Sequence, residues 1–78
     1  MNHLRDTELL KTFGEGVKKL RQERGFTQKQ LALKMDVEIS QVSRIERGLN
    51  NPTLTTLIHL AESLEVNVCQ LFGKKLGK

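Results

Sequence analysis

Apolar residues in this chain recur at steps of three and four residues, and this spacing constrains the fold more than any other feature. Leu10, Phe13, Val17 and Leu20 repeat with the period of an α-helix, and later segments do the same over shorter stretches. Valine and isoleucine nowhere alternate with polar residues over the length of a strand. The sequence therefore predicts an all-α fold built from five short helices.

The length of 78 residues limits what the chain can hold. We expect a single domain over residues 1–78, with a core from about 7 to 72 and a frayed tail at 73–78. A lone cysteine and two distant histidines predict no disulfide, no metal and no cofactor. Apolar runs are too short for a membrane-spanning helix, and the N-terminus has no secretion signal, so we expect a cytoplasmic protein.

The first helix is expected over about residues 7–24. Gly25 should end it, because glycine accepts the left-handed conformation that closes many helices. Gly14 and Gly16 lie inside this helix, where glycine is unfavourable compared with alanine. Either they permit the close approach of a neighbouring helix or they are merely tolerated, and we favour the second interpretation.

The next two helices are short and joined by a tight turn. Thr27 and Gln30 have the spacing of a capping box, which predicts a helix that begins there and ends near Met35. A third helix is expected over Ile39–Arg47, with Gly48 closing it. Two such helices joined by a tight turn form a helix-turn-helix, which presents the second helix outward.

Two more helices complete the predicted fold. Thr53 is expected to cap the fourth helix and Asn67 the short fifth helix. The apolar side chains of both helices should pack inward. They are Leu54, Leu57, Ile58, Ala61 and Leu64 in the fourth helix, and Val68 and Leu71 in the fifth.

Three segments together resemble the phage-repressor and Cro-type helix-turn-helix family, also called xenobiotic-response-element-like (XRE). These segments are Thr27-Gln28-x-x-Leu31-Ala32, Val42 to Gly48, and Asn51-Pro52-Thr53-Leu54-x-Thr56-Leu57. The resemblance covers about residues 13–72 and implies a five-helix DNA-binding domain. It implies a sequence-specific transcriptional regulator that binds double-stranded DNA as a homodimer on an inverted-repeat operator. Within this family, free-standing chains of this size resemble restriction–modification controller proteins and small phage or plasmid repressors.

The predicted third helix is the expected recognition helix, because an α-helix fits the major groove, where base edges differ. Arg44 is expected to pair with guanine, although a solvated surface arginine is the alternative. Ile39 could contact a thymine methyl group or pack partly inside the protein. The residues expected to contact bases are Glu38, Ile39, Ser40 and Arg44.

Gln28 opens the second helix, where free backbone N–H groups favour a phosphate. The resemblance implies that this glutamine contacts the DNA backbone and sometimes also supports the recognition helix. Polar residues that flank the same surface are candidates for phosphate contacts, with solvation as the alternative for each. The candidates are Gln28, Lys29, Gln41, Ser43, Arg47, Asn50 and Asn51.

A carboxylate beside a DNA surface needs another explanation. The resemblance implies that Glu46 forms a partly buried structural ion pair with Arg21, which ties the first helix to the third. Two residues depart from the family pattern. Asp36 stands where the family often has glycine, and aspartate tolerates a positive φ better than most residues. Glu38 replaces the usual short capping residue, and glutamate caps helices poorly.

A dimer is expected because one recognition helix contacts too few base pairs for high specificity. We expect the C-terminal residues Leu71, Phe72 and Leu76, with the loop after Gly48, to form the dimer interface. The alternative for this segment is ordinary core packing of the fifth helix, which we expect for Val68 and Leu71.

Other function classes fit less well. No paired acids, glycine-rich phosphate loop or metal-ligand spacing indicates an enzyme. The net charge of +4 agrees with a polyanionic partner, although no polybasic run exists. The alternative function is an antitoxin-type or protein-interaction helix-turn-helix module that binds a protein partner.

Overall fold

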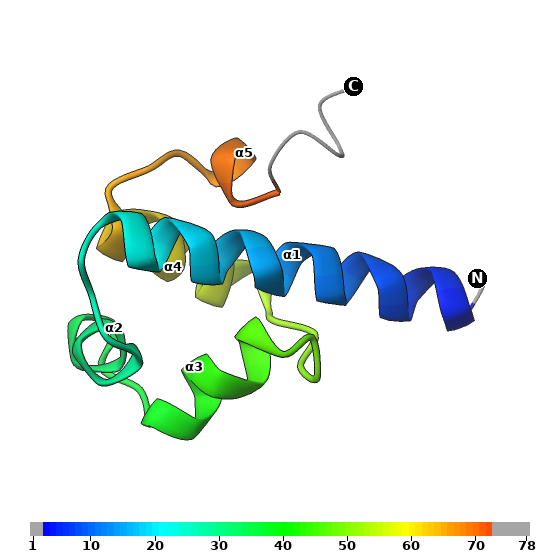
Figure 1. Cartoon of the computed structure of the whole chain (residues 1–78), viewed down its shortest axis with the longest axis horizontal. Coiled ribbons are helices and arrows are strands. Elements are labelled where there is room, and N and C mark those ends of the chain that lie inside the picture. The colour runs from blue at the N-terminus through cyan, green and yellow to red at the C-terminus, as the bar shows by residue number, and fades with distance from the viewer. Residues whose placement is uncertain (1–2, 73–78) are drawn as a thin grey trace.

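Five α-helices make up most of residues 3–72, the part of the chain that the computed structural model describes, and no strand occurs within it (Figure 1). The all-α prediction is confirmed. The helices are α1 (His3–Glu23), α2 (Gln28–Met35), α3 (Ile39–Glu46), α4 (Leu54–Leu64) and α5 (Val68–Leu71).

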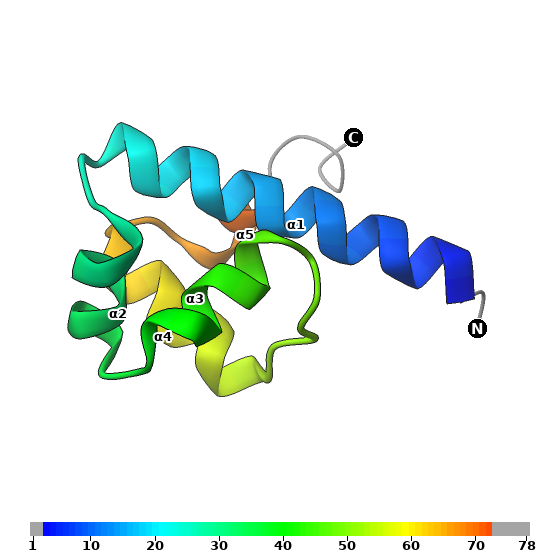
Figure 2. The ribbon, with the colours of Figure 1, turned by 60° about the horizontal axis from the view of Figure 1, so that its bottom comes forward.

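Helix α1 is longer than expected and begins at His3 rather than near residue 7. Residues 3–6 contain neither glycine nor proline, so no residue there interrupts the helix. Figures 1 and 2 show that the first turns of α1 project beyond the other helices. Farther along, Phe13 and Val17 are buried and anchor α1 to the core.

The two glycines of α1 lie where neighbouring backbones come close. A Cβ atom on Gly14 would collide with the carbonyl oxygens of Ile45 and Glu46, and one on Gly16 would lie 2.8 Å from the carbonyl oxygen of Leu71. Our preferred interpretation, that both glycines are merely tolerated, is therefore wrong. They let α1 pack directly against the end of α3 and against α5.

Local capping explains the boundaries of α2. The Thr27 hydroxyl accepts a hydrogen bond from the Gln30 amide at 3.1 Å, and the Gln30 side chain accepts one from the Thr27 amide at 2.9 Å. This confirms the predicted capping box. Asp36 then takes a left-handed conformation with φ of 60°, so aspartate does support the turn that glycine often makes.

Helix α3 ends one residue earlier than expected, at Glu46, and Gly48 follows with φ of 75°. Glu38 precedes α3 in an extended conformation and makes no side-chain capping bond, as expected for glutamate. Thr53 caps α4, as predicted, by accepting a hydrogen bond from the Thr56 amide at 3.2 Å.

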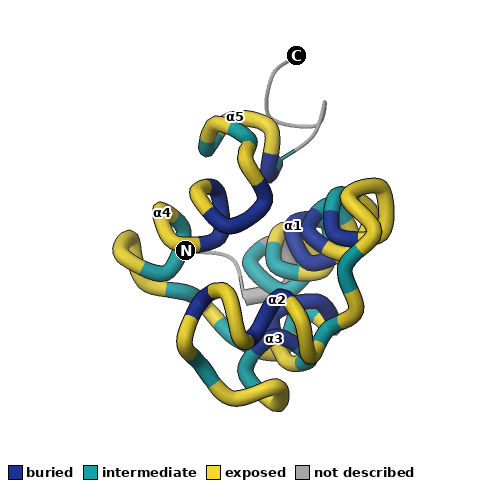
Figure 3. The backbone as a smooth tube through the Cα atoms, turned by 90° about the vertical axis from the view of Figure 1, so that its left-hand side faces the viewer, coloured by how far each residue is buried: buried dark blue, intermediate teal, exposed yellow. Residues whose placement is uncertain are grey.

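The buried side of α4 differs from the predicted one. Leu54 is 72% exposed and Ile58 is 41% exposed, whereas Leu60 is fully buried. Helix α4 has so many apolar residues that periodicity does not select one face, and packing against α2 and α5 decides the choice. Figure 3 shows the buried stretches turned towards the middle of the molecule. The buried apolar residues are Phe13, Val17, Leu31, Ala32, Met35, Val42, Ile45, Leu60, Ala61, Leu64 and Leu71.

Candidate nucleic-acid interface

Helix α3 packs with one side against the core and leaves the other side open to solvent. Val42, Ile45 and Glu46 face inward, and Arg44 and Arg47 are exposed. Figure 2 shows α3 after the turn from α2, with the loop to α4 leaving its far end. An exposed helix of this kind has the dimensions to enter the major groove.

The residues expected to contact bases all lie on the exposed side of this region. Ile39 is 47% exposed, so it is not a core residue. The full set of exposed base-contact candidates is Glu38, Ile39, Ser40 and Arg44. They offer a carboxylate, a branched apolar group, a hydroxyl and a guanidinium, which are groups able to distinguish base edges.

The expected phosphate contacts flank this surface with varied exposure. Lys29, Arg47 and Asn51 are exposed, whereas Gln28, Gln41, Ser43 and Asn50 are partly exposed. The Arg47 Nε atom donates a hydrogen bond to the carbonyl oxygen of Ser43 at 3.4 Å, one turn back in the chain. The Arg47 side chain is exposed, and its guanidinium carries further N–H donors besides Nε.

A buried ion pair fixes the inner side of α3. Arg21 Nε donates to Glu46 Oε2 at 2.6 Å, and Arg21 Nη2 donates to Glu46 Oε1 at 3.1 Å. Arg21 Nη1 also donates to the carbonyl oxygen of Phe26 at 2.8 Å. Both members of the expected pair are buried, with exposed fractions of 7% for Arg21 and 6% for Glu46. Two parallel bonds between planar groups hold α1 and α3 in one relative orientation.

Gln28 joins the same buried cluster. Its Nε2 atom donates a hydrogen bond to Glu46 Oε1 at 2.9 Å. The Glu46 carboxylate therefore connects α1, α2 and α3 at one point. A glutamine amide carries two N–H groups, so Gln28 can support α3 and still donate a second hydrogen bond outward. The shared contact of these three side chains could not be predicted from the sequence alone, because the residues are far apart in the chain.

The expected C-terminal interface needs correction. The Leu71 side chain is fully buried within its own chain, so it cannot contribute a surface to a dimer. The Phe72 ring is partly buried and lies 5.2 Å from the ring of Phe13, centroid to centroid. Leu76 lies outside the described residues.

The described part of the chain has neither a cluster of metal ligands nor a membrane-spanning helix. Among the side chains that the structure describes, those of residues 6–72, no three of His, Cys, Asp or Glu are grouped so that they could hold a metal ion. No helix in that part of the chain is both long enough and apolar enough to cross a membrane.

Comparisons with known proteins agree with this geometry. A family model described as helix-turn-helix matches residues 17–71. The immunity repressor of Bacillus phage phi105 is 39% identical over 64 residues, which is 82% of this chain and 44% of the repressor. The chain thus spans less than half the length of that relative. Antitoxin HipB of Escherichia coli K12 is 36% identical over 52 residues, covering 67% of this chain and 59% of the antitoxin.

Solved structures of restriction–modification controller proteins are also similar. C.AhdI from Aeromonas hydrophila superimposes with a TM-score of 0.79 at 33% identity, over 81% of this chain and 96% of that one. The controller protein C.Esp1396I, solved as a tetramer with its natural 35 base-pair operator, gives a TM-score of 0.77 at 33% identity. That match covers 88% of this chain and 91% of the controller.

Proposed function

The chain belongs to the helix-turn-helix family, and on this basis we propose that it is a sequence-specific transcriptional regulator that binds double-stranded DNA. It binds an inverted-repeat operator as a homodimer, with one α3 in the major groove of each half-site. The observation that carries this proposal is the exposed side of α3, with Ser40 and Arg44, held from within by the Arg21–Glu46–Gln28 cluster. The similarity to a controller protein solved on its operator supports it.

The protein acts by occupying a site near a promoter, where it either blocks or recruits polymerase. This activity is binding without a catalytic step. A DNA-binding regulator must share a compartment with its DNA. We therefore place this protein in the cytoplasm.

The exposed residues of α3, and Glu38 just before it, have proposed roles at the bases. Arg44 donates two hydrogen bonds to a guanine, and Ser40 donates to or accepts from a neighbouring base edge. Ile39 contacts a thymine methyl group. Glu38, whose carboxylate makes no capping bond, accepts from a cytosine amino group. The seven flanking polar residues named above contact phosphates and set the position of α3.

Selection of bound duplexes from a random DNA library tests the proposal. The expected result is an inverted repeat whose half-sites lie about 34 Å apart, which is one turn of the double helix. Affinity for the recovered duplex should fall steeply as salt rises, because bound phosphates release counterions. A library that yields no enriched sequence, or binding that salt does not weaken, would contradict the proposal.

Replacing Arg44 with alanine should weaken binding to the selected duplex by about 1–3 kcal/mol and relax the preference at one position in each half-site. The reason is the loss of a bidentate contact to a base. Binding can be measured by fluorescence anisotropy on the selected duplex and on single-base variants. Arg24→Ala is the matched control, because it removes the same charge from the exposed turn that follows α1. An equal loss on every duplex would make Arg44 a phosphate contact instead.

Replacing Gln28 with alanine should weaken binding to selected and unrelated duplexes to a similar extent. This side chain supports α3 through Glu46 and donates its second N–H to a phosphate, and neither contact depends on base sequence. Titrations of both duplexes measure the effect, with the exposed Gln22 of α1 replaced by alanine as the control. A loss confined to the selected duplex would show that Gln28 contacts a base.

A second candidate function is that of an antitoxin, a DNA-binding module that also binds a protein partner. The similarity to HipB supports it. Purification from the native host separates the two functions. A second protein present in stoichiometric amount favours the antitoxin, and a homogeneous protein that binds the selected duplex unaided favours the regulator.

A further inference from the structure

An open groove lies at the turn of the helix-turn-helix, between α2 and the first residue of α3. Its volume is about 410 Å³. The residues that line it are Lys29, Ala32, Leu33, Val37, Glu38 and Ile39. Figure 2 shows the turn from α2 leading directly into the N-terminal end of α3. The N-terminal residues of a recognition helix are those that contact base edges, so this groove lies where α3 would meet the bases.

The groove combines apolar walls with one carboxylate. Leu33 is 72% exposed and Ile39 is 47% exposed, so these apolar side chains are accessible to a ligand. Glu38 is exposed as well, and its side chain makes no capping bond to α3. Its carboxylate can therefore accept hydrogen bonds from a ligand in the groove. The other charged residue of the groove is Lys29, a candidate for a phosphate contact.

A carboxylate beside DNA requires a hydrogen-bond donor, because a buried carboxylate without a partner is costly. In the major groove, cytosine N4 and adenine N6 carry amino groups that donate, whereas thymine O4 and guanine O6 are acceptors that a carboxylate repels. Glu38 therefore favours cytosine or adenine over the other two bases.

The apolar walls decide between these two bases. Next to its amino group, adenine presents N7 to the major groove, an acceptor that an apolar side chain leaves unpaired. Cytosine presents C5 there, the position that carries the methyl group of thymine. Thymine thus has the methyl group without the donor, and cytosine has the donor without the methyl group. Cytosine methylated at C5 has both, side by side on one edge.

We propose that this groove binds 5-methylcytosine, so that the protein prefers an operator methylated at one cytosine in each half-site. The inference rests on the proposed function and places two of its contacts on one base. Glu38 accepts a hydrogen bond from the N4 amino group, and Ile39 contacts the methyl group on C5. The methyl group that Ile39 contacts is thus that of 5-methylcytosine, and thymine is the weaker ligand at this position.

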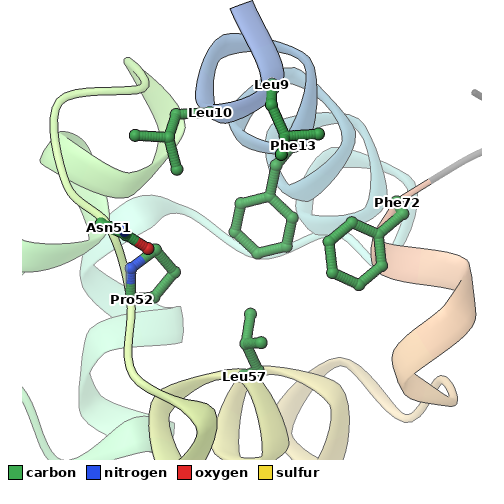
Figure 4. A pocket seen from close by; sticks show the side chains of 7 residues that line it. All are labelled: Leu9, Leu10, Phe13, Asn51, Pro52, Leu57 and Phe72. Atoms are coloured by element: carbon green, nitrogen blue, oxygen red, sulfur yellow. The ribbon is translucent and has the colours of Figure 1, made fainter. Parts of the chain in front are cut away.

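A second pocket, of about 120 Å³, shares no residue with this groove (Figure 4). Figure 4 shows its side chains turned towards one shared space from α1, from the loop before α4, from α4 and from the residue that follows α5. The residues that line it are Leu9, Leu10, Phe13, Asn51, Pro52, Leu57 and Phe72. None of them is a carboxylate, so this pocket lacks the acceptor that selects an amino group in the groove. Leu9 is 44% exposed, close to the exposure of Ile39, and supplies a control position.

Titration of the full chain with methylated duplexes tests the inference. Each cytosine of the selected duplex is replaced in turn by 5-methylcytosine, in one half-site or in both, and fluorescence anisotropy gives the affinities. At one position per half-site, methylation should tighten binding by about 4-fold in one half-site and by about 15-fold in both, as expected for burial of one methyl group in each. Thymine at that position should bind about 10-fold more weakly than 5-methylcytosine, because its O4 atom meets the Glu38 carboxylate.

Two variants separate the two contacts. Ile39→Ala should abolish the gain from methylation and keep the preference for cytosine over thymine. Glu38→Gln should keep the gain and lose that preference, because an amide can donate to thymine O4 as well as accept from cytosine N4. Leu9→Ala is the control and should change neither ratio. All three positions are exposed, and far-UV circular dichroism confirms that each variant remains helical.

A selected duplex whose affinity is unchanged after methylation of every cytosine would overturn the inference and leave the regulator intact. A gain from methylation that persists in Ile39→Ala would also overturn it, as would tighter binding to N6-methyladenine in place of 5-methylcytosine. A library that yields no enriched duplex would instead contradict the proposed function itself, and the inference would fail with it.

Discussion

Replacing Arg21 with alanine is expected to lower the free energy of unfolding by about 3–5 kcal/mol, the largest effect anticipated for a single side chain in this protein. The change leaves the Glu46 carboxylate buried with the hydrogen bond from Gln28 but without its positive partner. It also removes the donor to the carbonyl oxygen of Phe26. Because small domains are stable by only about 5–15 kcal/mol, such a loss brings the variant close to unfolding.

Urea unfolding followed by circular dichroism measures this loss. Arg24→Ala is the control, because this exposed arginine just after α1 makes only a 3.3 Å hydrogen bond to the carbonyl oxygen of Glu65 and should change stability by less than about 0.5 kcal/mol. A double variant with methionine at positions 21 and 46 should regain most of the lost stability, since it leaves no uncompensated charge. A loss below about 1 kcal/mol for Arg21→Ala would mean that the pair behaves like a surface ion pair.

Replacing Gly14 with alanine should destabilise the protein by about 3 kcal/mol, at the upper end of typical overpacking effects. Alanine is the better helix former by about 1 kcal/mol, so without a neighbour the change would stabilise α1. The added methyl group would instead collide with the backbone at Ile45 and Glu46, which cannot rotate away as a side chain could. Helix α1 must therefore move away from the end of α3.

Thermal unfolding tests directly whether Gly14→Ala lowers or raises the stability of the protein. For a domain of this size, about 3 kcal/mol corresponds to a decrease in Tm of roughly 12–24 °C. Glu15→Ala, at the exposed neighbouring position in α1, should change Tm little. An unchanged or higher Tm for Gly14→Ala would show that α1 and α3 are not in direct backbone contact.

Features that depend on neighbouring residues could be predicted from the sequence. The Thr27–Gln30 capping box, the left-handed Asp36 and the Thr53 cap all act within a few residues, and each has its expected geometry. The exposed side of α3 was likewise predictable, because Val42 and Ile45 define its inner side by spacing alone.

Features that depend on which elements meet could not be predicted in the same way. The spacing of α4 is compatible with more than one buried side, and only tertiary packing selects Leu60 over Leu54. The role of Gly14 depends on a backbone more than thirty residues away in sequence. At the candidate site, the resemblance gave the Arg21–Glu46 pair, but the hydrogen bond from Gln28 to the same carboxylate required the structure.

The central claim is that the exposed side of α3 lies against the bases of double-stranded DNA. A titration of isotope-labelled protein with the selected duplex, followed by two-dimensional ¹H–¹⁵N NMR, tests it residue by residue. The account predicts that the largest shifts occur at Ile39, Ser40 and Arg44, with smaller ones at Gln28 and Lys29. Large shifts confined to α4 and α5, with those α3 signals unmoved, would contradict it.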